Sequence, residues 1–158
     1  MKKILPLVIL FVTTAFSYSY GQENIQTPPA QLLSLYFNIK DALVGGNPTI
    51  AAVKAEDFVK VINTIDSKII NDASRSALLK DATAISVTKN IKDQRIHFSS
   101  FSDNMIALVK TVKLSGEPVY QQYCPMKKAS WLSPQAAIKN PYYGNAMLTC
   151  GKVEATLK

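Results

Sequence analysis

The sequence predicts a mainly α fold: an up-and-down four-helix bundle with an irregular C-terminal tail, containing a short strand and a short helix, packed on it. Three observations predict this fold. Apolar residues recur at helical spacing in four segments, short turn-rich links separate the segments, and the periodicity stops after Leu114. The length of 158 residues, 47% of them hydrophobic, suits one domain with a core large enough to fold without disulfide or metal staples.

Proline and glycine bound the first two predicted helices. The first begins around Pro28, because proline is tolerated in the first turn of a helix, and Gly45-Gly46 ends it. The second begins at Pro48 and continues its apolar face as far as Ile65.

The other two helices are predicted from periodicity. A polar stretch over residues 66–76 ends or bends the second helix, and a third helix follows from Leu78 to Val87. The fourth helix covers about residues 91–113, where aromatic and aliphatic residues recur every three or four positions.

The tail lacks this periodicity. Residues 119–123 alternate as in a strand, and Ser133-Pro134 is typical of a capped helix start. Residues 140–145 are rich in turn formers, and the chain then leads into a short polar end. We expect this tail, residues 115–158, to lie along the bundle within a single helical domain of residues 22–158.

The N-terminus is typical of a secretory signal. A basic start is followed by an apolar run over residues 4–16 and by the small residues Ser19 and Gly21. The run is too short for a membrane anchor, which needs about 20 apolar residues. We therefore expect a signal peptide over residues 1–21 that is cleaved off, a periplasmic or otherwise exported protein, and no membrane span after cleavage.

The net charge gives little indication of a partner. The formal charge is +7, and removal of residues 1–21 takes away Lys2 and Lys3 but no acid, which leaves +5. Because the remaining lysines are scattered along the periodic segments, they indicate a solvated face, and no nucleic-acid partner is expected.

Soft metal-binding side chains gather in the second half of the chain. Beyond residue 21, every His, Cys and Met lies between positions 97 and 150: His97, Met105, Cys124, Met126, Met147 and Cys150. Thiolate and thioether donors select Cu(I). In an extended segment, residues two positions apart lie on the same face, as Cys124 and Met126 would. In a helical turn, residues three positions apart lie on the same face, as Met147 and Cys150 would.

We therefore expect a site for Cu(I) or Ag(I) formed by Cys124, Met126, Met147, Cys150 and His97, with Met105 in the core. The expected function is that of a periplasmic metal-binding carrier or buffer. Two alternatives stay open. His97 fits a structural, hydrogen-bonded histidine slightly better than a ligand. The two cysteines of an exported protein can also pair, which would make the chain a disulfide-stapled protein-interaction module without metal.

No catalytic template fits the sequence. Cys124 and His97 resemble a nucleophile and its base, but no residue is marked as the third, orienting member. The sequence contains no G-x-S-x-G, H-E-x-x-H or P-loop motif. We expect that the protein is not an enzyme.

The tail resembles the domain of unknown function 3347 family. The resemblance is carried by Y-Q-Q-Y-C-P-M at residues 120–126, W-L-S at 131–133, N-P-Y-Y-G at 140–144 and M-L-T-C-G at 147–151. The helical part is similar too, in Y-F-N-I-K-D-A-L-V at 36–44 and in Q-R-I-H-F at 94–98 with L-V-K at 108–110.

This family occurs as small exported proteins and fused to periplasmic adaptor subunits of copper and silver efflux pumps. The resemblance therefore implies copper handling or heavy-metal efflux in the periplasm, with the same five residues as ligands. It also implies an efflux adaptor as a partner besides the metal ion. Because this sequence has no adaptor portion, the expected role is that of a carrier or buffer.

Overall fold

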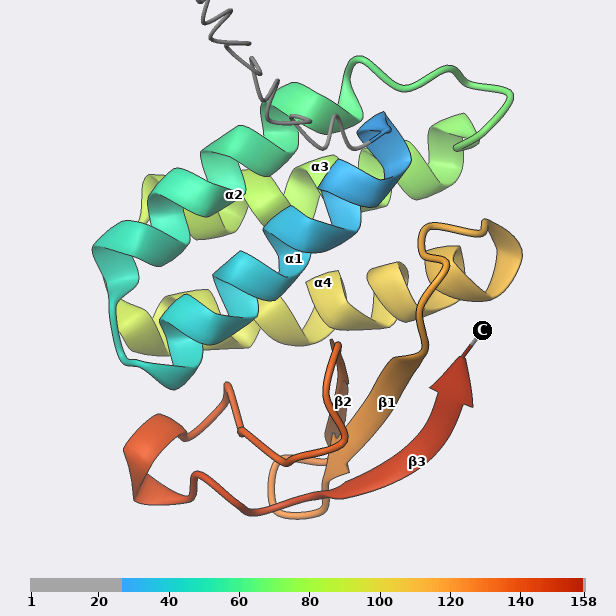
Figure 1. Cartoon of the computed structure of the whole chain (residues 1–158). Helices are drawn as coiled ribbons and strands as arrows, with labels where there is room; N and C mark the ends of the chain where they lie inside the picture. The colour runs from blue at the N-terminus through green and yellow to red at the C-terminus, as the bar shows by residue number, and fades with distance from the viewer. Residues whose placement is uncertain (1–26, 158) are drawn as a thin grey trace, which may run out of the picture.

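The computed structural model describes residues 27–157, which form four helices followed by a small sheet (Figure 1). The signal peptide expected over residues 1–21 lies outside the described residues. Along the chain the helices are α1 (Pro28–Val44), α2 (Pro48–Ile62), α3 (Asp72–Val87) and α4 (Ile91–Thr111). Each helix packs mainly against the next one in sequence, which confirms the predicted mainly α bundle.

Three asparagines set the starts of the later helices. The side-chain oxygens of Asn47, Asn71 and Asn90 accept hydrogen bonds from backbone N–H groups in the first turns of α2, α3 and α4. The cap at Asn71 explains why α3 begins at Asp72, earlier than the apolar periodicity indicates. The expected polar stretch after α2 is a short link followed by this first turn of α3.

Aromatic rings from three helices meet in the core of the bundle. Tyr36 of α1 stacks on Phe98 of α4 with ring centroids 5.5 Å apart, and Phe58 of α2 meets Phe101 of α4 edge-on at 4.8 Å. All four side chains are fully buried. Such pairs stabilise the fold beyond the burial of their apolar area.

The tail forms a three-stranded antiparallel sheet with the strand order β2-β1-β3. Its strands are β1 (Val119–Cys124), β2 (Ala129–Ser133) and β3 (Lys152–Leu157), and the 3₁₀ turn η1 (Gly144–Ala146) lies between the last two. The strand expected at residues 119–123 is confirmed. The polar end of the chain is also a strand, because β3 pairs with β1.

The helix start expected at Ser133-Pro134 is wrong. Ser133 ends β2, and residues 134–137 are a series of bends. The buried side-chain amide of Gln122 donates to the carbonyls of Gln135 at 2.9 Å and Ala136 at 3.1 Å. These carbonyls bond to a side chain of β1 and not to backbone N–H groups four residues further on, so no helix forms. The short helix of the tail is η1.

Two tyrosine hydroxyls, one from α1 and one from the tail loop, bond the outer edge of the sheet. The edge strand β2 presents an N–H and a carbonyl away from β1: Leu132 N–H donates to the Tyr36 hydroxyl at 3.0 Å, and the Tyr142 hydroxyl donates to Ser130 O at 2.6 Å. Tyr36 also bonds Ser102 of α4 at 2.7 Å. An uncovered strand edge invites pairing with other chains, and these contacts cover it. Figure 1 shows the sheet lying alongside α4.

Within residues 27–157, no helix combines the length and the apolar character needed to cross a membrane.

Candidate metal centre

The two cysteines of the chain lie next to each other in space although 26 positions separate them. Cys124 is the last residue of β1 and is fully buried, and Cys150 lies just before β3 and is partly exposed. Their sulfur atoms are 3.7 Å apart, and both residues are free thiols. The antiparallel pairing of β1 with β3 brings them together, because the end of β1 lies beside the start of β3.

A tight turn positions Met126 beside this pair. The β1–β2 link covers residues 125–128, and it closes with a 2.8 Å hydrogen bond from Lys128 N–H to Cys124 O. Lys128 has a positive φ of 54°, which is uncommon for a residue with a side chain. Met126 is 64% exposed, so its thioether is available to solvent two residues after Cys124.

A second turn carries Met147. Cys150 N–H donates to Met147 O at 3.1 Å, which closes one turn between them. The expected helical turn is here a single turn outside any helix, because both residues lie beyond η1. Met147 is 39% exposed, and the structure therefore places one solvent-accessible thioether on each of the two segments that carry a cysteine.

Asn140 contacts the cysteine pair, and the sequence did not reveal this. It is fully buried, and its side-chain amide donates to Cys150 O at 2.8 Å. Its side-chain oxygen accepts from Tyr142 N–H at 2.9 Å, and its own N–H donates to Leu148 O at 2.8 Å. The Asn140 side chain also hydrogen-bonds the Cys124 sulfur. Asn-Pro-Tyr is a common turn signal, and nothing in its pattern distinguishes an asparagine that holds two cysteines.

Gly151 lets the chain pass close to β1 next to Cys150. Its φ is +153°, and a Cβ there would lie 2.9 Å from the Trp131 ring and 3.0 Å from Tyr123 O. Contacts this short do not occur for real Cβ atoms, so a larger residue would push Cys150 away from Cys124.

The two thiols have opposite pKa shifts. Burial of Cys124 would raise its pKa, but hydrogen bonds from Lys127 N–H, the Asn140 side chain, the Cys150 thiol and Met126 N–H favour the thiolate, and the net pKa is lower than usual. The pKa of Cys150 is raised, first because its thiol donates to Cys124 and then by burial and by the negative charge of Cys124. The two thiols therefore titrate as a coupled pair, in which Cys124 loses its proton before Cys150.

The structure does not bring His97 to this pair. His97 precedes Ser100 by three residues and Asn104 by seven, so the three share one flank of α4. Ser100 and Asn104 both donate to the carboxylate of Asp81, at 2.8 Å and 2.9 Å, so this flank faces α3. The tail contacts α4 on another flank, through Arg95 and Ser102. Met105 is fully buried in the bundle, as expected of a core residue.

Across residues 27–157, no three His, Cys, Asp or Glu side chains lie together as a metal-binding group. The sulfur cluster therefore consists of two cysteines with two exposed methionines next to them in sequence.

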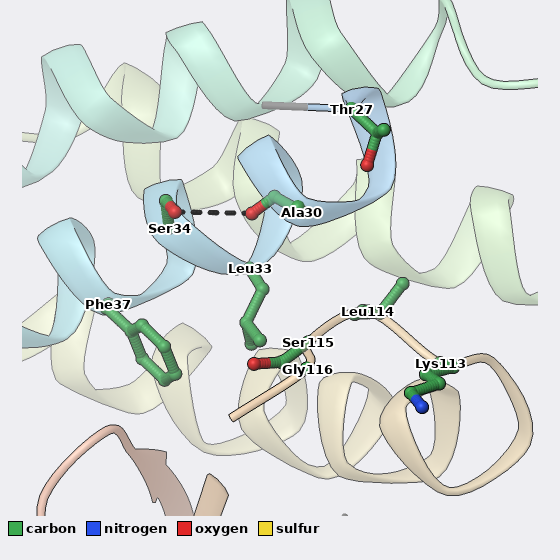
Figure 2. A pocket seen from close by; sticks show the side chains of 9 residues that line it. All are labelled: Thr27, Ala30, Leu33, Ser34, Phe37, Lys113, Leu114, Ser115 and Gly116. Carbon is green, nitrogen blue, oxygen red and sulfur yellow. Dashed lines mark hydrogen bonds between the residues drawn. The ribbon is translucent and has the colours of Figure 1, made fainter. Parts of the chain in front are cut away.

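A hollow of about 410 Å³ near the start of α1 has different chemistry (Figure 2). It lies between α1 and the link after α4, and Lys113 is its one charged lining residue. Figure 2 shows Ser34 in its wall, bonded back to Ala30 O at 3.2 Å within α1. No cysteine, methionine or histidine lines this hollow.

The family model described as "Protein of unknown function (DUF3347)" matches residues 32–117. The chain belongs to this family. The match covers more than half of the chain, from α1 to the link before β1, so the DUF3347 assignment rests on the helices. The cysteine pair and the tail motifs lie beyond the matched residues. Searches of curated proteins and of solved structures found no match.

Proposed function

We propose that this DUF3347 protein binds one Cu(I) or Ag(I) ion through Cys124 and Cys150 and acts as an exported carrier or buffer in copper handling or efflux. The observation that carries the proposal is the 3.7 Å separation of the two sulfur atoms, with thiolate-favouring hydrogen bonds on one of them. Thiolates supply charge and softness together, which Cu(I) prefers over harder ligands.

The sulfur separation suits a shared ion with more than two ligands. With a metal–sulfur distance of about 2.3 Å, two thiolates are about 3.8 Å apart at a tetrahedral angle, about 4.0 Å at a trigonal angle and about 4.6 Å when opposite each other. The observed 3.7 Å is close to the first two values. An ion held by two thiolates at this separation leaves room for a third donor, and the thioethers of Met126 and Met147 are the soft donors nearest along the chain.

Metal binding at this pair depends on pH. The lowered pKa of Cys124 makes its thiol the easier of the two to ionise, and the raised pKa of Cys150 makes its thiol the harder. Because each metal-bound thiol has lost its proton, binding releases protons and weakens as the pH falls. His97 has no part in the proposed site, since its flank of α4 faces α3.

Exposure at the site suits transfer to another protein. Cys124 is buried, whereas Cys150 and both methionines are accessible to solvent. An incoming ligand could therefore replace the exposed donors before the buried one. The partner proposed from the family resemblance is a periplasmic efflux adaptor.

The same sulfur separation supports one competing function. A disulfide needs its sulfur atoms about 2.05 Å apart, so a shift of less than 2 Å would close the bond. The closed form would be a stapled protein-interaction module, in which a bridge over about 27 residues adds roughly 3.5 kcal/mol of stability.

A competition titration of the reduced protein against a Cu(I) chelator tests the proposal. We expect the wild type to take one equivalent of Cu(I) and the Cys124→Ser/Cys150→Ser variant to take none. Thr149→Ser is the matched control, since it alters an exposed neighbour of Cys150 without removing a soft donor.

Equal competition by wild type and the double variant would reject the metal site. A thiol count on protein from the native host distinguishes the metal-binding protein from the disulfide-stapled module. The metal-binding proposal expects two reactive thiols after removal of bound metal with a chelator. No free thiols, together with a melting temperature that falls on reduction, would favour the stapled module.

A further inference from the structure

A cleft of about 320 Å³ lies where the first turns of α4 meet the tail. Its lining comes from α4, from the β1–β2 link and from the loop before η1: Lys92, Arg95, Ile96, Lys127, Tyr142 and Tyr143. This volume is at the lower end of the range for pockets that bind small molecules. None of the residues that line the cleft is a proposed copper ligand.

Three positive charges line the cleft without a negative one. Among residues 27–157, the ion pairs involve Lys40, Lys54 and Lys60, and none involves the three cations of the cleft. Asp93 follows Lys92 in sequence, but successive residues of a helix are about 100° apart around its axis. Asp93 is four residues before His97 and therefore lies on the flank of His97 and Ser100, not on that of Lys92. Converging like charges without a counter-ion attract an anion.

Arg95 is held in place and incompletely paired. One of its terminal nitrogens donates to Leu43 O at the end of α1 at 2.8 Å. Its Nε is buried and has no acceptor within the described part of the chain. Partial burial lowers the pKa of the guanidinium, because the charged form is desolvated. A Cβ on Gly144 would lie 2.6 Å from the same terminal nitrogen, so η1 closes over Arg95 only because residue 144 is glycine.

The remaining walls are flat and apolar. Tyr142 uses its hydroxyl on Ser130 O, so its contribution to the cleft is the ring. Tyr143 is half-buried, and Ile96 is 60% exposed, so both side chains present apolar surface to a ligand in the cleft. Aromatic faces and an aliphatic side chain favour a ligand with a flat apolar body.

We propose that this cleft binds a small organic anion, in which a carboxylate or phosphate group is attached to a planar ring. The anionic group lies among Lys92, Arg95 and Lys127, and the ring lies against Tyr142, Tyr143 and Ile96. Lys127 adjoins both sites, because its backbone N–H bonds the Cys124 sulfur and its side chain lines the cleft.

Titration calorimetry on the purified protein, with four probes, tests the proposal. Benzoate and phenyl phosphate carry the charge and the ring, phenol carries only the ring, and inorganic phosphate carries only the charge. We expect saturable binding of the first two, which weakens as salt rises from about 20 to about 300 mM. Phenol and inorganic phosphate should bind at least about tenfold more weakly, since each lacks half of the contacts.

Exposed lysines supply the variants, because their loss leaves the fold intact. Lys92→Gln and Lys127→Gln should each weaken benzoate binding about two- to fivefold, the usual range for one exposed charge. Lys110→Gln, an exposed lysine at the far end of the same helix, should bind as the wild type does. Lys92→Gln should leave Cu(I) competition unchanged, because Lys92 is not among the groups that act on either thiol.

Two results would overturn the proposal. One is equal benzoate affinity in Lys92→Gln, Lys127→Gln and Lys110→Gln, which would show that the cleft charges do not contact the anion. The other is a neutral or ringless probe that binds as tightly as benzoate and phenyl phosphate, which would remove the case for a ligand with both features.

Discussion

The helical bundle and the sheet-bearing tail are stabilised by different interactions. The largest fully buried side chains belong to the helices and the α2–α3 link, with the single exception of Trp131 in β2. In the tail, buried polar groups such as Gln122 and Asn140 make several hydrogen bonds each. An apolar core tolerates changes of similar size, whereas a buried polar network depends on each of its members.

The family match and the candidate metal ligands fall in different regions of the molecule. The DUF3347 match covers the bundle, and both cysteines lie in the tail beyond it. The tail keeps its cysteines in place through Asn140, Gly151 and Trp131 rather than through a core of its own. The comparison therefore predicts that the tail can be loosened, and the thiol pair lost, while the bundle stays folded.

The largest expected effect comes from removing one large side chain from each region. Phe58→Ala and Trp131→Ala should each cost about 3–5 kcal/mol, because both leave a cavity among fully buried neighbours. Phe58→Ala should lower the stability of the whole protein. Trp131→Ala should expose residues 119–157 to hydrogen exchange while the helical circular dichroism persists. Uniform loss of exchange protection in both variants would show that the two regions unfold as one unit.

A smaller effect is expected from Asn140→Ala. The change leaves Tyr142 N–H and Cys150 O without their partner, which costs about 1–3 kcal/mol for a buried polar group. Loss of its bond to the Cys124 sulfur should raise the pKa of that thiol and weaken Cu(I) binding by about tenfold or more. Chelator competition and thiolate absorbance measure the two results. An unchanged affinity would mean that Asn140 only folds the loop. Asn145→Ala, an exposed asparagine of the same loop, is the control.

The thiol pair should titrate in two separated steps in the reduced, metal-free protein. The first should lie below the ordinary cysteine pKa of about 8.5, and the second above it, because the thiolate of Cys124 keeps the proton on Cys150. Cys150→Ala removes one hydrogen bond to Cys124, so the single remaining step should move upward from the first wild-type step. Thiolate absorbance against pH measures this shift. Two overlapping steps at the ordinary value would contradict the close contact of the sulfurs.

The smallest expected effects test whether the third Cu(I) ligand comes from the tail or from the bundle. Met126→Leu keeps the side-chain volume and removes the thioether, so it should weaken Cu(I) binding severalfold without changing the melting temperature. His97→Gln should leave the affinity unchanged, because its flank of α4 faces α3. Chelator competition on both variants measures the contrast. A larger loss in His97→Gln than in Met126→Leu would reverse this assignment.

The apolar repeat determined much of the fold by itself. Helix positions follow from contacts along one face, and helix ends from local residues such as Pro28, Gly45 and Pro48, so both can be inferred from neighbours in sequence. The start of α3 was missed because a single asparagine cap outweighed the weak periodicity around it.

The sequence also indicated which residues carry soft donors, but not which of them meet. Chemistry and spacing predict Cys124, Met126, Met147 and Cys150 as ligands, and His97 is predicted with them because it lies in the same stretch of candidate donors, residues 97–150. Only the tertiary structure brought Cys124 to within 3.7 Å of Cys150 and placed His97 on a flank of α4 that faces α3. That outcome depends on the pairing of β1 with β3 and on the bonds of Asn140. These contacts join residues far apart in sequence, and no local pattern encodes them.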